Sequence, residues 1–252
     1  TSTPTTSAIE DAEYSYQVTS ADIDVGDILS ISGTYPGWLT LVDNGDGTAD
    51  LSGIPTNDDV GDHSVVLVVT DNSGATDEQS FMINVSNTND APFFTSTAIE
   101  EATEDVAYTY TVTASDVDVG DELTFAVPTL PDWLTYDIVT QVLSGTPTND
   151  EVGGHSVVLT VSDGFVTVNQ EFTITVENTN DAPFFTSTPT TSAIEDAEYS
   201  YTATSADIDV GDILSISGEY PGWLILVDNG DGTAGLSGTP TNDDVGDHSV
   251  VL

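Results

Sequence analysis

Hydrophobic and polar residues alternate along several short stretches of the chain. Tyr14, Tyr16 and Val18 alternate with polar neighbours, and the same period of two recurs over residues 80–85 and 171–176. Successive side chains of a β-strand point to opposite faces, so each stretch predicts a strand with one buried face. No stretch keeps the 3.6-residue period of an amphipathic helix. The pattern therefore predicts an all-β protein.

Two further stretches complete this picture. The uninterrupted apolar run Val65–Val69 predicts a central strand that is covered on both sides. The segment Asp43–Gly47 carries Asn-Gly and Asp-Gly between two apolar runs, which indicates a hairpin turn. About seven short strands separated by turn residues are typical of a β-sandwich of the Ig type.

The sequence is internally repetitive. Residues 1–67 recur as residues 186–252 without a gap and with six differences, and a diverged copy lies between them. All three copies share D-x-D-V-G-D, P-x-W-L, L-S-G-x-P-T-N-D and H-S-V-V-L. We expect three tandem β-sandwich domains, called repeats 1 to 3, at residues 1–94, 95–185 and 186–252, with linkers at 87–94 and 178–185. Repeat 3 is the shortest copy, and we expect the chain to be part of a longer array.

Composition adds a constraint on charge. The chain has no Lys and no Arg against 44 Asp and Glu, for a formal net charge of −44. Self-repulsion on this scale opposes compaction, so external cations have to offset it where carboxylates gather. Nucleic acid and anionic membranes would repel such a chain, and no apolar run is long enough to insert into a bilayer. The strand pattern and a hydrophobic content of 38% exclude a disordered chain.

Acidic residues recur at three fixed places in repeats 1 and 2 and at two of these places in repeat 3. The chain contains no Cys, so the metal chemistry open to these clusters is that of oxygen ligands. Calcium takes six to eight oxygens from carboxylates, amides and backbone carbonyls in a tolerant geometry. The clusters are Asp22–Asp27 with its copies Asp116–Asp121 and Asp207–Asp212, Asn57–Gly61 with Asn149–Gly153 and Asn242–Gly246, and the linkers Asn87–Pro92 and Asn178–Pro183.

These motifs carry a family resemblance. N-T-N-D-A-P-F-F at a repeat boundary, D-x-D-V-G after the second strand and Asp163-Gly164 after the sixth resemble cadherin repeats. The sequences P-x-W-L and L-S-G-x-P-T resemble more specifically the bacterial dystroglycan-type cadherin-like and He-PIG domains. The resemblance covers nearly the whole chain. It implies an extracellular array, secreted or on the cell surface, with Ca²⁺ bound at each junction by two domains and their linker.

The resemblance also implies the ligands. At the first junction they are Glu10, Asp58, Asp59, Asn87, Asn89, Asp90, Asp116, Asp118 and Asp163. At the second they are Glu104, Asp150, Glu151, Asn178, Asn180, Asp181, Asp207 and Asp209. Asp22, Asp24 and Asp71 would face a preceding domain. The linker starts with Asn where cadherins have Asp and is one residue shorter, so we expect one or two ions per junction instead of three.

Plainer interpretations stay open beside these. The acidic clusters could be solvated turns with Asx capping. Trp38, Trp133 and Trp223 are expected to be core aromatics, with carbohydrate stacking as the alternative, and His63, His155 and His248 are expected to be structural. Paired carboxylates could serve glycoside hydrolysis. Because they recur in turns of every repeat, we expect no enzyme.

Two functions follow. The first is an extracellular, calcium-stiffened repeat array that forms a rod, stalk or fibre. Its partners would be the neighbouring repeats and identical chains in a fibre. The alternative is an adhesion module that binds itself or a surface polysaccharide.

Overall fold

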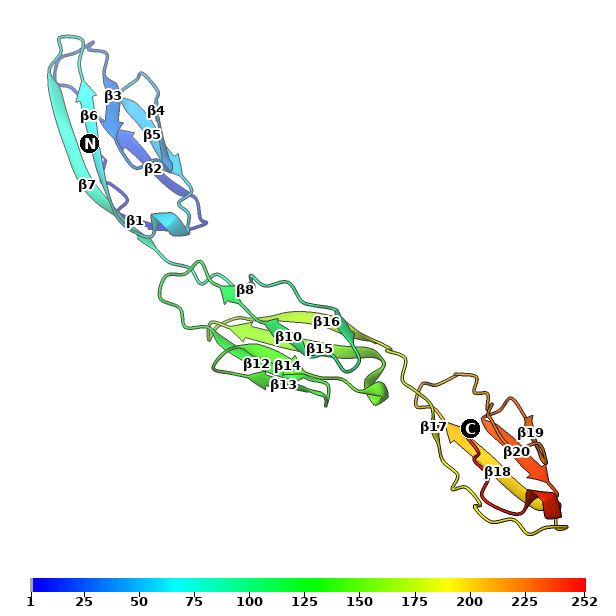
Figure 1. The fold of residues 1–252 in the computed structure, drawn as a ribbon. Coiled ribbons are helices and arrows are strands. Elements are labelled where there is room, and N and C mark those ends of the chain that lie inside the picture. The colour runs from blue at the N-terminus through cyan, green and yellow to red at the C-terminus, as the bar shows by residue number, and fades with distance from the viewer. Residues whose placement is uncertain (1) are drawn as a thin grey trace. The chain divides into compact units, whose positions relative to one another are not determined.

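The computed structural model describes residues 2–252, and its regular elements are β-strands apart from three short helical turns (Figure 1). The chain forms two compact units, and each is described by itself. The first comprises residues 2–96, 113–126 and 159–170, and the second comprises residues 97–112, 127–158 and 171–252. Within residues 2–252 the helical segments are three 3-10 turns, η1 (Asn57–Asp59), η2 (Asn149–Glu151) and η3 (Asn242–Asp244). The all-β prediction is confirmed.

The first unit contains the complete sandwich of repeat 1. Its strands form two sheets, in the orders β1-β7-β6-β3 and β2-β5-β4. The seven strands agree with the predicted number and are β1 (Ser7–Ile9), β2 (Tyr14–Thr19), β3 (Ser30–Thr34), β4 (Leu39–Asp43), β5 (Thr48–Gly53), β6 (Gly61–Thr70) and β7 (Thr76–Ser86). Beyond them, β8 (Phe93–Phe94) pairs with β11 (Ala114–Ser115) in an antiparallel ladder. This pairing places the linker 87–94 beside the loop that follows β11.

The core of repeat 1 lies between its two sheets. Tyr14, Tyr16 and Val18 on β2 are buried and alternate with exposed residues, as their sequence pattern predicts. Leu51 on β5 and Ile83 on β7 are fully buried against them. Removing such side chains from water supplies the main driving force of folding, about 2 kcal/mol for each large aliphatic residue.

The prediction for the apolar run of β6 is correct in one part and wrong in the other. β6 is central, because it pairs with β7 on one side and with β3 on the other. Its Val65 and Leu67 are buried, whereas Val66 and Val68 are only half-buried. An antiparallel sheet packs one face on the core and leaves the other toward solvent, so the run is not covered on both sides.

The predicted hairpin turn joins β4 to β5. Gly45 and Gly47 have φ values of +73° and +82°, which side chains with a Cβ rarely adopt. The Asp46 carboxylate accepts hydrogen bonds from the backbone and the hydroxyl of Thr48, at 3.1 and 2.6 Å. The hydroxyl bond is the main reason why the pKa of Asp46 lies below its ordinary value. The segment is thus a turn whose polar groups satisfy one another.

Trp38 packs against the core of repeat 1, with its ring between the rings of Tyr14 and His63. Its ring meets Tyr14 and His63 edge to face, with centroid separations of 5.7 and 6.0 Å. The Nε2 atom of His63 lies 2.6 Å from the carbonyl oxygen of Asp59, which holds the ring beside η1. The same arrangement recurs at Trp133 with Tyr108 and His155, and at Trp223 with Tyr199 and His248. These contacts support the structural interpretation of the Trp and His residues.

The second unit contains the three-stranded sheet β10-β14-β13 and the four-stranded arrangement β17-β18-β20-β19. β9 pairs in parallel with the end of β16. The strands are β9 (Glu101–Thr103), β10 (Tyr108–Thr111), β13 (Leu134–Asp137), β14 (Val142–Gly145), β17 (Phe184–Phe185), β18 (Tyr199–Ala206), β19 (Leu224–Asp228) and β20 (Thr233–Gly238). Three strands have residues in both units, namely β12 (Thr124–Thr129), β15 (Gly153–Ser162) and β16 (Thr167–Glu177). The repeat boundaries at residues 94 and 185 stay a prediction.

No helix among residues 2–252 is long and apolar enough to cross a membrane.

One glycine of the L-S-G-x-P motif yields a stability prediction. A Cβ on Gly53 would lie 2.0 Å from the carbonyl oxygen of Trp38, and Gly145 and Gly238 face the same clash in their repeats. We expect Gly53→Ala to destabilise repeat 1 by about 1–3 kcal/mol, since β4 would have to move away. Urea unfolding followed by Trp fluorescence measures this. Gly37→Ala, where a Cβ meets nothing within 4 Å, is the matched control. Equal stabilities of the two variants would contradict the prediction.

Candidate metal centres

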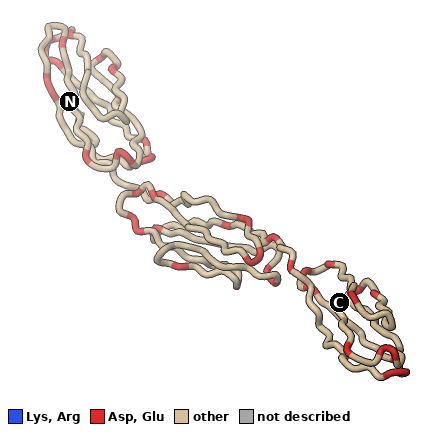
Figure 2. The backbone as a smooth tube through the Cα atoms, viewed as in Figure 1, with Lys and Arg blue, Asp and Glu red and all other residues tan. Residues whose placement is uncertain are grey.

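Three carboxylates from separate elements meet in the first unit. Glu10 directly follows β1, Asp90 lies in the linker between β7 and β8, and Asp118 lies in the loop after β11. One oxygen of each lies within 4.8 Å of the others. Figure 2 shows acidic residues on many of the loops and no Lys or Arg beside them. These three negative charges therefore have no side-chain cation to neutralise them.

A tight turn directs Glu10 inward. Asp11 has a φ of +57°, a conformation that Asp tolerates, and its N–H donates to the carbonyl of Pro55 at 2.8 Å. The Glu10 side chain is only 2% exposed. Its Oε1 accepts a hydrogen bond from the N–H of Thr88, whereas its Oε2 is buried and has no partner among the described residues. A buried carboxylate oxygen without a donor is costly, and a cation would satisfy it.

Asp118 is hydrogen-bonded to η1, to the linker and to its own loop. Its side chain is 6% exposed. Oδ1 accepts from the Asn57 amide of η1 at 2.8 Å, and Oδ2 accepts from the N–H of Asp90 at 2.7 Å. The N–H of Asp118 in turn donates to Oδ1 of Asp116 at 3.1 Å. The other oxygen of Asp116, Oδ2, is buried and has no partner among the described residues. The centre thus contains two orphaned carboxylate oxygens.

A second group of three carboxylates includes Asp118, which also belongs to the first group. Asp116, Asp118 and Asp121 also approach one another within 4.8 Å. Asp121 was not among the predicted ligands, although it is the last residue of the recurring D-x-D-V-G-D motif and could have been found there. The sequence prediction also assigned no role to Asn57, whose amide donates a hydrogen bond to Asp118, because only the two acidic residues of its cluster were named.

The environment shifts the pKa values of these groups in opposite directions. Desolvation, followed by the nearby charges of Asp118, Asp11 and Asp116, raises the pKa of Asp90. Asp163 behaves differently: it accepts hydrogen bonds from the N–H groups of Val166 and Phe165 at 2.6 and 2.7 Å. The bond from Val166 is the largest reason why its pKa is lowered. Asp90 therefore resists ionisation, while Asp163 is held ionised.

The predicted linker residue Asn89 contacts Asp163. Its Nδ2 donates to Oδ2 of Asp163 at 2.9 Å and to the carbonyl of Asp90 at 2.6 Å. Asn87 accepts a long hydrogen bond of 3.5 Å from Asn57. Hydrogen bonds thus connect the linker amides to Asp163 and Asn57, and the role of Asn87 and Asn89 as metal ligands stays a prediction.

The second unit repeats the arrangement. Glu104, Asp181 and Asp209 form one group, and Asp207, Asp209 and Asp212 form the other. Glu104 is 2% exposed and accepts from the N–H of Thr179 at 3.1 Å. Asp209 accepts from the N–H of Asp181 at 2.6 Å and from the amide of Asn149 at 3.1 Å. Asn180 donates to the carbonyl of Asp181 at 2.6 Å, and Asn149 donates to Asn178 at 3.4 Å.

A smaller group lies in repeat 1, on the loops after β2 and β6. Asp22, Asp27 and Asp71 approach one another within 4.8 Å and are more exposed than the other groups. Asp27 was missed by the sequence prediction, which named Asp24 in its place. The N–H of Asp24 donates to Oδ1 of Asp22 at 2.9 Å, an Asx turn, and its carboxylate stays outside the group.

Besides Asp163, four of the acidic residues predicted as ligands at the two junctions lie outside the carboxylate groups found among residues 2–252. Asp58 and Asp150 are exposed. Asp59 accepts from the N–H and hydroxyl of Thr56, both at 2.9 Å, and so closes η1. Glu151 does the same for η2 with Thr148, at 2.7 Å, and the Thr148 hydroxyl is the main cause of its lowered pKa. Capping hydrogen bonds thus occupy the carboxylates of Asp59 and Glu151. The role of all four residues as metal ligands stays a prediction.

Comparisons with known proteins identify similar sequences and folds. A family model described as "Putative Ig domain" (He_PIG) matches residues 1–86 and 91–177. The extracellular domain of protocadherin gamma B4 is similar with a TM-score of 0.54 and 18% identity, over 97% of this chain and 46% of that one. Cadherin domains 1–4 of protocadherin gamma B7 give a TM-score of 0.53 and 15% identity, over 94% and 67%. These two show the fold alone.

An endo-fucoidan hydrolase of glycoside hydrolase family 107 is 30% identical, over 96% of this chain, with a TM-score of 0.35. The chain spans 40% of the length of that hydrolase. No curated protein matches the chain.

The raised pKa of Asp90 predicts how the metal-free chain responds to pH. A group whose pKa is higher in the folded than in the unfolded state binds its proton first in the folded state, so stability rises as pH falls through that range. We expect the melting temperature of the dialysed wild-type chain to gain on that of Asp90→Asn as the pH falls from 7 toward the ordinary range of an Asp carboxyl. Differential scanning calorimetry measures both. Asp77→Asn, at an exposed position of β7, should keep the wild-type slope. An unchanged slope for Asp90→Asn would contradict the prediction.

Proposed function

The chain belongs to the He_PIG family of Ig-like domains, and we propose that it is a calcium-stiffened repeat array of an extracellular structural protein. The single observation that carries the proposal is the orphaned Oε2 of Glu10, buried beside Asp90 and Asp118. Each of these carboxylates comes from a different element, so an ion bound to all three joins those elements.

The donor set fits calcium. The carboxylate groups contain oxygen ligands only, without His or Cys, and hard oxygen ligands favour Ca²⁺ or Mg²⁺ over zinc and copper. Glu10, Asp90, Asp116, Asp118 and Asp121 together offer several oxygens from flexible loops. Calcium tolerates such an irregular set, whereas Mg²⁺ demands near-octahedral geometry and keeps most of its water.

A bound cation would supply the positive charge that the chain lacks. It would offset the repulsion among the clustered carboxylates, which at separations below 5 Å is strong even near a protein surface. Binding to the folded state alone stabilises that state by mass action. Because Asp90 and the N–H of Thr88 belong to the linker, the ion also restricts the backbone that connects repeat 1 to repeat 2.

Calcium affinities of extracellular modules, about 10⁻⁴–10⁻³ M, suit a secreted or cell-surface location. The partners of each repeat are then its neighbours in the same chain and identical chains in a fibre. No catalytic role is proposed. The carboxylate groups recur in loops of every repeat, which suits a structural ion and not a single reaction centre.

The alternative, adhesion to identical chains or to a surface polysaccharide, is favoured by the sheet edges. β4 and β19 each end the strand order of their sheets. Val42 on β4 and Ile225 and Val227 on β19 are 53%, 65% and 58% exposed. An exposed edge strand with apolar side chains can accept a further strand. Self-association by analytical ultracentrifugation and binding on a glycan array test this function, and silence in both would exclude it.

Calcium titration of the dialysed chain tests the main proposal. We expect calcium to raise the melting temperature, and Glu10→Gln to weaken binding at the first centre about tenfold or more while leaving the second intact. Glu104→Gln should do the reverse, because the two centres lie in separate units. Isothermal titration calorimetry measures both, and Asp77→Asn serves as the charge-matched control. Calcium-independent melting of the wild-type chain would refute the proposal.

The stiffening itself requires a distance measurement. The absence of Cys allows a unique pair of spin labels, for example at Ser32→Cys on β3 and Thr124→Cys on β12, both exposed and in the first unit. We expect the distance distribution to narrow when calcium is added to the labelled chain and to stay broad in its Glu10→Gln version. An equally broad distribution with and without calcium would exclude stiffening, even if calcium binds.

A further inference from the structure

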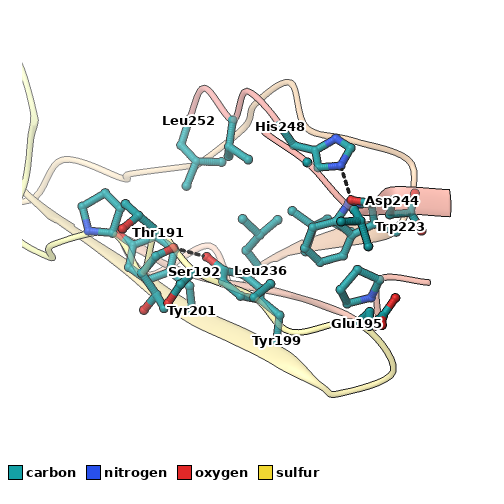
Figure 3. A pocket seen from close by; sticks show the side chains of 18 of the residues that line it. Thr191, Ser192, Glu195, Tyr199, Tyr201, Trp223, Leu236, Asp244, His248 and Leu252 are labelled. Carbon is teal, nitrogen blue, oxygen red and sulfur yellow. Dashed lines mark hydrogen bonds between the residues drawn. The ribbon is translucent and has the colours of Figure 1, made fainter. Parts of the chain in front are cut away.

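The chain contains two Asn-Gly pairs, and both lie in hairpin turns. Asn44-Gly45 lies in the turn between β4 and β5, and Asn229-Gly230 lies in the turn between β19 and β20. Both pairs are exposed. The strands beside the second turn reach into the core of repeat 3, where Leu236 of β20 packs with Tyr201 of β18 (Figure 3). The packed strands thus hold a turn that presents its Asn-Gly pair to solvent.

An asparagine followed by glycine is open to attack by the next backbone nitrogen. Glycine has no Cβ to shield that nitrogen, and a Cβ on Gly45 or Gly230 would meet no atom beyond its chain neighbours within 4 Å. When the nitrogen attacks Cγ of the Asn, a C–N bond forms and the bond from Cγ to Nδ2 breaks. Nδ2 leaves as ammonia with the proton of the backbone nitrogen. Water then opens the cyclic imide at either carbonyl, which leaves an aspartyl or an isoaspartyl residue.

The attacking nitrogen is held alike in the two turns. The strands on either side pair in the same register, up to Asp43 in repeat 1 and Asp228 in repeat 3. Gly45 and Gly230 have φ values of +73° and +72°. The N–H of each donates to Oδ1 of the Asp two residues earlier, at 3.1 Å in both turns. The backbone therefore does not distinguish the two sites.

One side-chain contact does distinguish them. In repeat 1 the Nδ2 of Asn44 donates to the hydroxyl of Thr48 at 3.0 Å and to Oδ2 of Asp50 at 3.2 Å. In repeat 3 the Nδ2 of Asn229 donates to the corresponding Thr hydroxyl at 2.8 Å. Gly235 stands at the place of Asp50, one of the six differences between the two copies. The carboxylate beside Asn44 thus has no counterpart in repeat 3.

We propose that Asn44 and Asn229 are sites of spontaneous deamidation, and that the residue at position 50 or 235 sets the rate. The attack develops negative charge around Cγ of the Asn, and the Asp50 carboxylate beside Asn44 opposes that charge. The hydrogen bond to Asp50 also holds the amide that has to leave. Both effects slow the reaction in repeat 1, so Asn229 reacts first.

The product changes the turn in two ways. A carboxylate replaces a hydrogen-bond donor, in a chain that has no Lys or Arg to offset the added charge. In repeat 1 the new carboxylate would face Asp50, the former acceptor. The isoaspartyl form also lengthens the backbone by one carbon between two paired strands. Deamidation therefore marks the turn at which each hairpin loosens first.

Timed incubation of the purified chain at neutral and mildly alkaline pH tests the proposal. Chymotryptic cleavage after Leu releases peptides 42–51 and 227–236, whose masses differ through Asp50 and Gly235. Mass spectrometry follows deamidation in each peptide. We expect Asn229 to react about two- to fivefold faster than Asn44, the range that exposed charge pairs produce. Both should react faster than Asn72, an exposed Asn that is followed by Ser.

A double variant separates the contact from the repeat that contains it. Asp50→Gly combined with Gly235→Asp exchanges the two turn sequences, and a Cβ on Gly235 meets no atom beyond its chain neighbours within 4 Å. We expect the order of the rates to reverse, with Asn44 now the faster. The proposal is overturned if Asn229 stays the faster in this variant. Equal rates at the two sites of the wild-type chain, or a rate at Asn72 that matches either of them, would also overturn it.

Discussion

The electrostatics of a chain with charges of one sign constrain the whole structure. With no Lys or Arg, every carboxylate has to be dispersed into solvent, held by polar hydrogens of the chain, or supplied with an external cation. Most surface carboxylates are exposed to solvent. Asp46, Asp59 and Asp163 instead accept hydrogen bonds from the chain, each within its own turn. Glu10 and Asp116 each have a buried carboxylate oxygen that neither solvent nor a hydrogen bond from the described residues satisfies. The sandwich framework is what holds these oxygens in place, because hydrophobic burial within each repeat offsets the local electrostatic cost.

The fold could be predicted to a large extent from sequence, because its signals are local. The period of two at Tyr14–Val18 and the glycines of the β4–β5 turn each specify conformation within a few residues. The burial of β6 was predicted wrongly for a non-local reason. An apolar run does not reveal whether its second face meets another layer, and Val66 and Val68 meet none that covers them fully.

The candidate centres could be predicted in outline but not ligand by ligand. Recurrence of the acidic motifs and the family resemblance indicated Glu10, Asp90 and Asp118, which the structure brings together. Sequence spacing could not show that Asp59 turns back to Thr56, since a capping bond and a metal bond use the same type of residue at the same place. Sequence spacing also could not show that the carboxylate of the last Asp in D-x-D-V-G-D lies close to the carboxylates of the first two. That depends on the loop geometry, including Gly120 at a φ of +106°.

Asp118 belongs to both carboxylate groups of the first centre, and Asp209 has the same double membership in the second. Two ions at one centre would therefore share a bridging carboxylate, and occupancy of one position would change the affinity of the other. A first ion would orient the shared side chain for the second, while the two positive charges would repel each other across it. The sign of this coupling follows from which effect is larger, and the coupling is reciprocal between the two positions. If calcium filled both positions, the centre would respond to calcium concentration as a coupled pair, with a steepness set by one shared aspartate.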